Sequence, residues 1–159
     1  MKILVVYDSV FGNTGQVAHA IGKALGSETA VEMLLAKDTK PEQLAGVELL
    51  VVGSPTRKFS ATPSVNRFLN RMPSRWLKGV HVAAFDTRFD ERDVNSRFLL
   101  ALVKRFGYAA EPLLKKLEKK GGEPVLPAEG FFVAGEEGPL KDGELERAVQ
   151  WAELILKSL

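Results

Sequence analysis

Short, unbroken runs of apolar residues alternate along this chain with segments whose apolar residues recur every three or four positions. The apolar runs lie at residues 3–7, 29–35, 48–53, 79–85 and 130–134, and their lack of alternation is typical of strands covered on both faces. The segments at 16–25, 62–72, 108–120 and 143–157 have the spacing of amphipathic helices. Strands separated by helices predict an α/β fold with a parallel sheet and right-handed crossovers.

The loop after the first predicted strand combines small polar residues with two glycines. Residues 8–15 read DSVFGNTG and lead directly into the first predicted helix. Backbone N–H groups at a helix N-terminus bind anions, and the side chains of Ser9, Asn13 and Thr14 add further donors. Gly12 and Gly15 would let a ligand approach the backbone closely. The same residue types also make ordinary turns and helix caps, which is the alternative interpretation of this loop.

The features that this loop lacks narrow the choice of ligand. It has no GxGxxG pattern, so a Rossmann dinucleotide site is unsupported, and no GxxxxGK[ST] pattern, which excludes a nucleoside-triphosphate P-loop. No Lys or Arg occurs between Lys2 and Lys23. A phosphate bound here would therefore be held by uncharged donors, which suits a tightly kept monophosphate.

The stretch VVYDSVFGNTGQVAHAI resembles the signature of the flavodoxin family, in which a hydroxyl residue, a glycine and a threonine at this spacing surround the phosphate of FMN. Here these positions are Ser9, Gly12 and Thr14. Phe11 departs from the pattern, because many flavodoxins carry another hydroxyl residue there. The resemblance implies a three-layer, flavodoxin-like α/β sandwich with a five-stranded parallel sheet in the order 2-1-3-4-5. In this order ligands gather outside the carboxyl ends of strands one and three.

Two further loops at the same edge of the sheet are similar to the flavodoxin loops that bracket the isoalloxazine ring. They are residues 54–61, SPTRKFSA, and residues 86–93, DTRFDERD. The resemblance therefore implies FMN as the cofactor and a binding site without catalytic residues or metal ligands. The expected FMN-binding residues are Ser9, Phe11, Gly12, Asn13, Thr14, Gly15, Ser54, Pro55, Thr56, Arg57, Lys58, Phe59, Asp86, Thr87, Arg88 and Phe89.

Phe59 and Phe89 are the candidate walls of the ring, since a flavin needs apolar or aromatic surfaces beside it. Flavodoxins commonly use Trp and Tyr instead, so burial of either Phe in the core, or coverage of the ring by Arg57 or Arg88, stays open. An additional helix is predicted at residues 94–106, ended by Gly107, between strand four and the next helix. It is interpreted as a lid over the cofactor, with a surface decoration or a dimer contact as alternatives.

Composition limits the other functions that this chain could have. Its 159 residues, of which 45% are hydrophobic, predict a single domain spanning 1–159. Because there are no cysteines, disulfides and thiolate chemistry are excluded, and redox chemistry requires a bound cofactor. His19 and His81 have no partner at metal-ligand spacing. The first apolar run is too short for a signal sequence or a membrane span, so a cytoplasmic location is expected.

Charge is unevenly distributed along the chain. Residues 55–105 carry 11 basic and 4 acidic side chains, a net of +7, whereas the whole chain is at +2. A basic rim would steer acidic partners to the expected site. Flavodoxins are generally acidic, so positive charge from Arg57 or Arg88 is expected to make the FMN potential less negative here. Binding of nucleic acid is not expected, because the basic residues are scattered and no motif accompanies them.

The favoured function is electron transfer between redox partner proteins through FMN, by a monomer or weak homodimer. The alternative is an FMN-dependent oxidoreductase acting on a small anionic or quinone-type substrate, of the quinone reductase or protoporphyrinogen-oxidising type. A receiver-type phosphorylation switch is set aside, because Gly53 and Ser54 stand where its aspartate is required. A flavin-free binding module is the remaining alternative.

Overall fold

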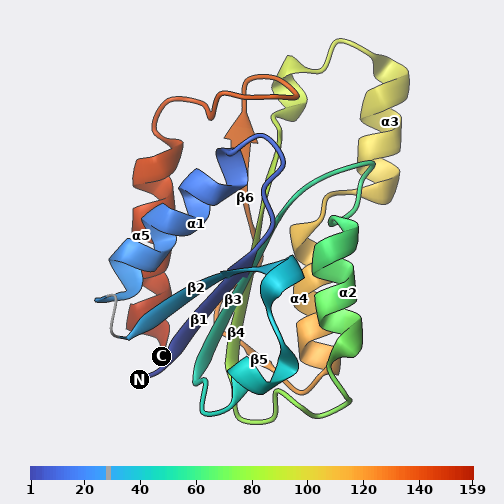
Figure 1. Ribbon diagram of the computed structural model, residues 1–159. Helices are drawn as coiled ribbons and strands as arrows, with labels where there is room; N and C mark the ends of the chain where they lie inside the picture. The colour runs from blue at the N-terminus through green and yellow to red at the C-terminus, as the bar shows by residue number, and fades with distance from the viewer. Residues whose placement is uncertain (28–29) are drawn as a thin grey trace.

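The computed structural model describes residues 1–27 and 30–159 and confirms the predicted parallel sheet (Figure 1). The strand order is β2-β1-β3-β4-β5, and β6 also pairs with β4. All of these pairings are parallel. The strands are β1 (Ile3–Tyr7), β2 (Val31–Leu35), β3 (Leu49–Pro55), β4 (His81–Phe89), β5 (Glu123–Pro124) and β6 (Glu129–Val133).

Helices cover both faces of the sheet, so the molecule has three layers (Figure 1). The α-helices are α1 (Asn13–Leu25), α2 (Pro63–Arg71), α3 (Arg97–Phe106), α4 (Ala110–Lys119) and α5 (Glu144–Ser158). Short 3-10 turns occur at η1 (Ala36–Asp38), η2 (Pro41–Leu44) and η3 (Glu91–Asp93). Helices α1 and α5 lie on one face, and α2 and α4 lie on the other. Among the described residues, none of the helices has the length and apolar character that crossing a membrane requires.

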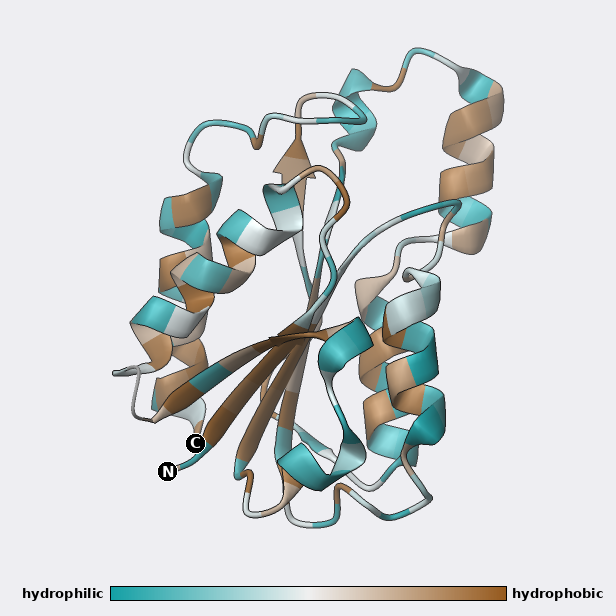
Figure 2. Ribbon diagram, in the orientation of Figure 1, coloured by the Kyte–Doolittle hydropathy of each residue, from teal (hydrophilic) through white to brown (hydrophobic). Residues whose placement is uncertain are grey.

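The alternation of side chains along each strand divides the core into two clusters. Ile3 and Val5 of β1 belong to the cluster that contains Trp151 of α5, whereas Leu4 and Val6 belong to the one that contains Phe68 of α2. Both sets are buried, which explains why β1 is apolar at every position from 3 to 6. The strands are brown along most of their length in Figure 2, as a sheet covered on both faces requires.

One close contact in the sheet requires glycine at position 53. A Cβ atom on Gly53 would lie 2.1 Å from the Phe85 ring, too close for any other residue. The ring occupies this space because it also packs edge-on against Phe131 and Trp151, with centroid distances of 6.0 and 6.2 Å. Gly53 therefore allows an aromatic cluster to reach the centre of the sheet.

Several predicted boundaries were wrong, and the errors fall near the expected site. Helix α1 begins at Asn13 rather than residue 16, because Gly12 ends the loop with φ 95°. Strand β3 continues to Pro55 and β4 to Phe89, so Asp86–Phe89 are strand residues rather than loop residues. The fifth strand position is filled by two segments, β5 and β6, where one strand was predicted. Thr29, predicted to begin the second strand, lies outside the described residues.

The additional helix α3 exists, but it begins at Arg97 rather than at residue 94. The Ser96 side chain caps it by accepting a hydrogen bond from the Leu99 amide at 3.2 Å. Gly107 ends it with φ 70° and ψ −149°, a conformation that essentially only glycine adopts. Helix α3 stands apart from the other helices, beyond the carboxyl ends of the strands (Figure 1).

Candidate functional site

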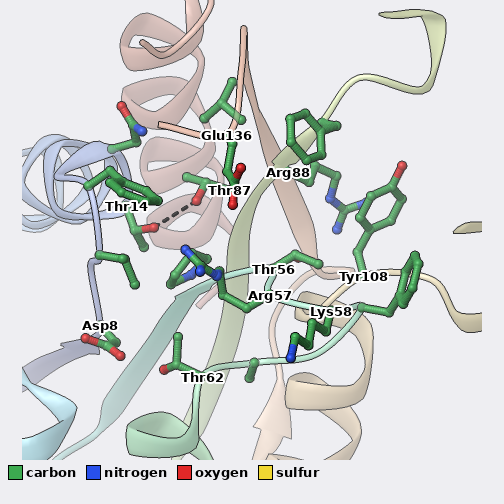
Figure 3. Close-up of a pocket in the computed structure, with 18 of the residues that line it drawn as sticks. Asp8, Thr14, Thr56, Arg57, Lys58, Thr62, Thr87, Arg88, Tyr108 and Glu136 are labelled. Carbon is green, nitrogen blue, oxygen red and sulfur yellow. Dashed lines mark hydrogen bonds between the residues drawn. The ribbon is translucent and has the colours of Figure 1, made fainter. Parts of the chain in front are cut away.

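A cleft of about 810 Å³ opens at the carboxyl ends of β1, β3 and β4 (Figure 3). Its volume is near the upper end of the range of roughly 300–1,000 Å³ for small-molecule sites. Most of the lining residues come from the loop before α1, from the segment after β3, from the end of β4 and from α3, and the others come from the start of α2, from Tyr108 and from the end of β6 and beyond. The three predicted loops and the additional helix therefore meet at one cleft.

The N-terminus of α1 presents unpaired donors beside this cleft. Among the described residues, the amides of Gly12, Asn13 and Thr14 donate to no protein acceptor. Asn13 and Thr14 line the cleft, and both side chains are nearly buried. Three free amides at the positive end of a helix dipole are suited to an anion such as a phosphate.

The side chains of Ser9 and Asn13, both predicted phosphate ligands, make hydrogen bonds within the protein that hold the loop before α1 in place. The Ser9 hydroxyl accepts a hydrogen bond from the Gly15 amide at 3.1 Å, which closes the loop around residues 10–14. The Asn13 side chain donates to the carbonyl of Glu137 at 3.1 Å and so joins the loop to the segment after β6. Neither Ser9 nor Gly15 lines the cleft. The bond between Ser9 and Gly15 sets the shape of the loop, and the amides of Gly12, Asn13 and Thr14 remain available to bind a ligand.

Threonine hydroxyls connect the loop before α1 to β4 and the segment after β3. The Thr14 and Thr87 hydroxyls are 2.8 Å apart and hydrogen bonded, as Figure 3 shows. The Thr56 amide donates to the Thr87 carbonyl at 2.9 Å, and the Thr56 hydroxyl accepts from the Ala109 amide at 3.1 Å. This network gives the cleft an uncharged, polar floor.

The segment after β3 forms a tight turn that carries two cations to the cleft. The amides and carbonyls of Arg57 and Ser60 bond reciprocally at 2.8 and 3.0 Å. Lys58 and Phe59 inside this turn have φ values of 48° and 64°, which are costly for non-glycine residues and recur at functional sites. The Arg57 guanidinium lies 5.5 Å from the centre of the Phe11 ring, so it spans the cleft towards the loop before α1. Neither Arg57 nor Lys58 has an ion-pair partner in the part of the chain that the structure describes.

Arg88, by contrast, is held inside the protein by the fully buried Asp86. Its Nε and terminal nitrogen donate to the two carboxylate oxygens at 2.6 and 2.8 Å, the bidentate geometry of an ion pair. Burial raises the pKa of the Asp86 carboxyl, while Arg88 and the Ala110 amide oppose that rise. The Arg88 guanidinium also stacks at 4.1 Å on the Tyr108 ring. Because its charge is already paired, Arg88 contributes less free positive charge to the cleft than Arg57.

Tyr108 closes this side of the cleft. Its hydroxyl donates to Glu91 at 3.3 Å. Burial, followed by the negative charge of Glu91, raises the pKa of Tyr108 to about 12. The phenol therefore stays protonated at neutral pH and presents an uncharged aromatic surface.

The end of the cleft next to α3 is apolar. Leu99 and Val103 of α3 line it together with Phe89, whose side chain is 44% exposed. The Phe59 ring lies 5.7 Å from the Phe106 ring of α3. Both candidate walls, Phe59 and Phe89, thus lie in the cleft rather than in the core, which decides against the burial alternative.

The predicted site residues divide into two groups. Those that line the cleft are Phe11, Asn13, Thr14, Pro55, Thr56, Arg57, Lys58, Phe59, Thr87, Arg88 and Phe89. Those that are not among the lining residues are Ser9, Gly12, Gly15, Ser54 and Asp86. Ser54 is fully buried and accepts a hydrogen bond from the Thr62 amide at 3.0 Å, so its hydroxyl fixes the turn before α2.

Sequence reasoning missed half of the lining residues. They are Asp8, Val10, Ala61, Thr62, Pro63, Val94, Leu99, Val103, Tyr108, Val133 and Glu136. Of these, Asp8, Val10 and Ala61 lie within the predicted loops, and Val94, Leu99 and Val103 lie within the predicted additional helix. Val133 and Glu136 come from the end of β6 and the segment after it, where no motif indicated a site.

Thr62 is the most informative of the missed residues. It occupies the cap position of α2, as predicted, but its side chain makes no capping hydrogen bond. Its hydroxyl is buried and has no partner among the described residues. Thr62 lines the cleft as a residue, but its hydroxyl is shielded from the cleft. A buried hydroxyl without a partner is costly for the fold. With free amides at one end and an apolar wall at the other, the cleft fits a phosphorylated, planar molecule such as FMN.

The chain is similar to known flavodoxins in sequence and in fold. A family model described as a flavodoxin domain matches residues 4–129. A flavodoxin from the domain Archaea is 24% identical, covers 99% of both chains and superposes with a TM-score of 0.76. Flavodoxin 1 from Bacillus cereus gives the same TM-score at 18% identity, covering 100% of this chain and 99% of the other. Rubredoxin oxygen:oxidoreductase from Desulfovibrio gigas matches at TM-score 0.71 and 17% identity over 99% of this chain, but over only 35% of its own.

Because the sequence identities are low, the solved structures establish only the fold. The family model matches most of the chain and therefore establishes the family. Strand order, the position of the cleft and the loop before α1 agree with that match. The chain therefore belongs to the flavodoxin domain family.

Proposed function

We propose that this protein binds FMN in the cleft and transfers electrons between redox partner proteins. The observation that carries the proposal is the make-up of the cleft, which lies beside the free amides of α1 at one end and is lined by apolar and aromatic side chains at the other. Bound FMN would supply the electron-accepting and electron-donating chemistry. The protein would supply binding, orientation and electrostatics.

Each part of the cleft has a role in this proposal. The amides of Gly12, Asn13 and Thr14 would hold the phosphate, and the Thr14–Thr87 bond would keep that cradle fixed to the sheet. Phe59 and Phe89 would flank the ring. Arg57 and Lys58 at the rim would attract partners with acidic docking surfaces. As part of this proposal, residues 1–159 form a single domain and the protein is located in the cytoplasm.

The first experiment is titration of the purified protein with FMN and with riboflavin, followed by absorbance and flavin fluorescence. We expect one FMN per chain, weaker riboflavin binding, and a bound flavin that can be chemically reduced. Turnover with NAD(P)H and quinones is then measured without a protein partner. Rapid turnover under these conditions would favour the oxidoreductase alternative, and failure to bind FMN would contradict the proposal.

Arg57 is expected to raise the midpoint potential of bound FMN. Reduction adds negative charge to the flavin, and the Arg57 cation has no ion-pair partner among the described residues. Arg57→Gln should therefore make the potential more negative by on the order of tens of millivolts. Redox titration measures this, and Arg67→Gln on the exposed face of α2 is the matched control. Equal potentials in wild type and Arg57→Gln would show that this charge does not act on the flavin.

A further inference from the structure

Helix α3 exposes large apolar side chains that the rest of the described chain covers only in part. Phe98 is 74% exposed. Phe106, whose ring lies 5.7 Å from the Phe59 ring, is 55% exposed, and Leu99, which also lines the cleft, is 40% exposed. Phe98, Leu102 and Phe106 follow one another at four-residue spacing, so they form one row along the helix. Figure 2 shows this helix as predominantly hydrophobic although it stands apart from the core. Exposed apolar surface of this kind marks an interaction site.

Charge on the same helix has a single sign. Arg97, Lys104 and Arg105 are exposed, and α3 contains no acidic residue. Arg97 lies in the first turn, where the helix dipole disfavours a cation. Arg97 therefore contributes little to the stability of the folded chain by itself. An anion bound from outside would stabilise its positive charge.

The shape and charge of α3 together favour one kind of partner. A second copy of the chain would bring the basic side chains of two α3 helices against each other, which is unfavourable. A folded protein would need a groove that matches a protruding helix. A fluid lipid surface with anionic headgroups adapts to such a ridge and neutralises its charge.

We propose that α3 binds the surface of an anionic lipid bilayer, with Phe98 and Phe106 inserted at the headgroup boundary and Arg97, Lys104 and Arg105 contacting phosphates. A helix with aromatic and aliphatic residues on one side and Lys or Arg on the other has the composition of interfacial helices. Since Leu99 and Val103 of the same helix line the cleft, binding places the cleft next to the bilayer. The inference does not require that FMN be bound.

The test is sedimentation of the purified full-length protein with lipid vesicles. One set contains phosphatidylcholine alone, and the other contains phosphatidylcholine and phosphatidylglycerol in equal amounts. We expect binding to the anionic vesicles, little binding to the neutral ones, and loss of binding as salt is raised. Phe98→Ser should weaken the partition into anionic vesicles about tenfold, because one inserted aromatic side chain is lost.

Two matched controls separate α3 from general effects of surface composition. Leu154→Ser removes a side chain that is 52% exposed on α5, on the opposite side of the molecule, and should leave the partition unchanged. Replacing Lys104 and Arg105 by Gln should weaken binding, whereas replacing Lys115 and Lys119 of α4 by Gln should weaken it much less. Circular dichroism and FMN titration of each variant establish that the fold is retained.

Four other outcomes of these experiments would overturn the inference. If the wild-type protein stays in the supernatant with both kinds of vesicle, or if Leu154→Ser loses as much binding as Phe98→Ser, α3 is not a lipid-binding helix. A dimer in solution that Phe98→Ser dissociates would assign α3 to a second copy. Binding to polyglutamate but not to anionic vesicles would assign it to an acidic protein. FMN titration is scored separately, so a failure here is distinguishable from a failure of the proposed function.

Discussion

Asn13→Asp is expected to raise the dissociation constant for FMN by at least about a hundredfold while changing riboflavin binding much less. Asn13 lines the cleft at the first position of α1 and is 8% exposed. A carboxylate there would repel the phosphate, at about 4 kcal/mol for like charges 4 Å apart at an effective dielectric constant near 20. Fluorescence titration with both flavins measures the difference, since riboflavin has no phosphate.

The control for this variant is Gln16→Glu, which adds the same charge to the first turn of α1 but on its exposed side. Solvent screens that charge, so FMN binding should weaken only slightly. Asn13→Asp also removes the hydrogen bond to the Glu137 carbonyl, and a loss from this cause would affect riboflavin equally. Similar losses for both flavins would therefore place the phosphate elsewhere.

Asp86→Asn is expected to lower the free energy of unfolding by about 3–5 kcal/mol, the largest effect on stability that we anticipate from a single side chain. The substitution keeps the shape of the side chain but removes the countercharge of Arg88. The Arg88 side chain is only 12% exposed, and its remaining partner, Glu111, is 52% exposed. Urea denaturation measures the change as a lower midpoint at constant slope.

A double variant identifies the cause of this loss. Combining Asp86→Asn with Arg88→Met removes the unpaired cation and should recover a large part of the stability, because well-packed apolar residues often replace a buried ion pair without loss. Asp38→Asn in η1, where the carboxylate is exposed, should change stability by less than about 0.5 kcal/mol. If the double variant is no more stable than Asp86→Asn, the unpaired charge is not the cause.

The parts of the fold that could be predicted are those specified by local pattern. The unbroken apolar runs identified β1, β3 and β4, because both faces of these strands are buried. The loop before α1 was predictable because its polar residues and glycines occur together within eight positions. By contrast, Asp86 and Arg88 resemble loop residues, and this part of β4 is a strand because it pairs with β3 and β6. These pairings extend the strand beyond its apolar segment.

Within the site, sequence reasoning found residues near the three loops and missed those contributed from a distance. Nothing near Thr62 indicates that its hydroxyl would be buried without a partner, since a Thr before Pro63 is an ordinary start of a helix. Tyr108, Val133 and Glu136 join the cleft only because β4, α4 and β6 converge there. The interpretation of α3 as a lid stays a prediction. Its side chains line the cleft, but only Val103 of this helix is buried.

The backbone at Gly107 sets the direction of α3 relative to the core. Residues 107–109 join α3 to α4, and α3 contributes one buried side chain, so a change at Gly107 would redirect α3 with little effect on the sheet. Because Leu99 and Val103 line the cleft, such a change would remodel its apolar end while leaving the loop before α1 intact. The two ends of the cleft are therefore free to diverge independently in evolution.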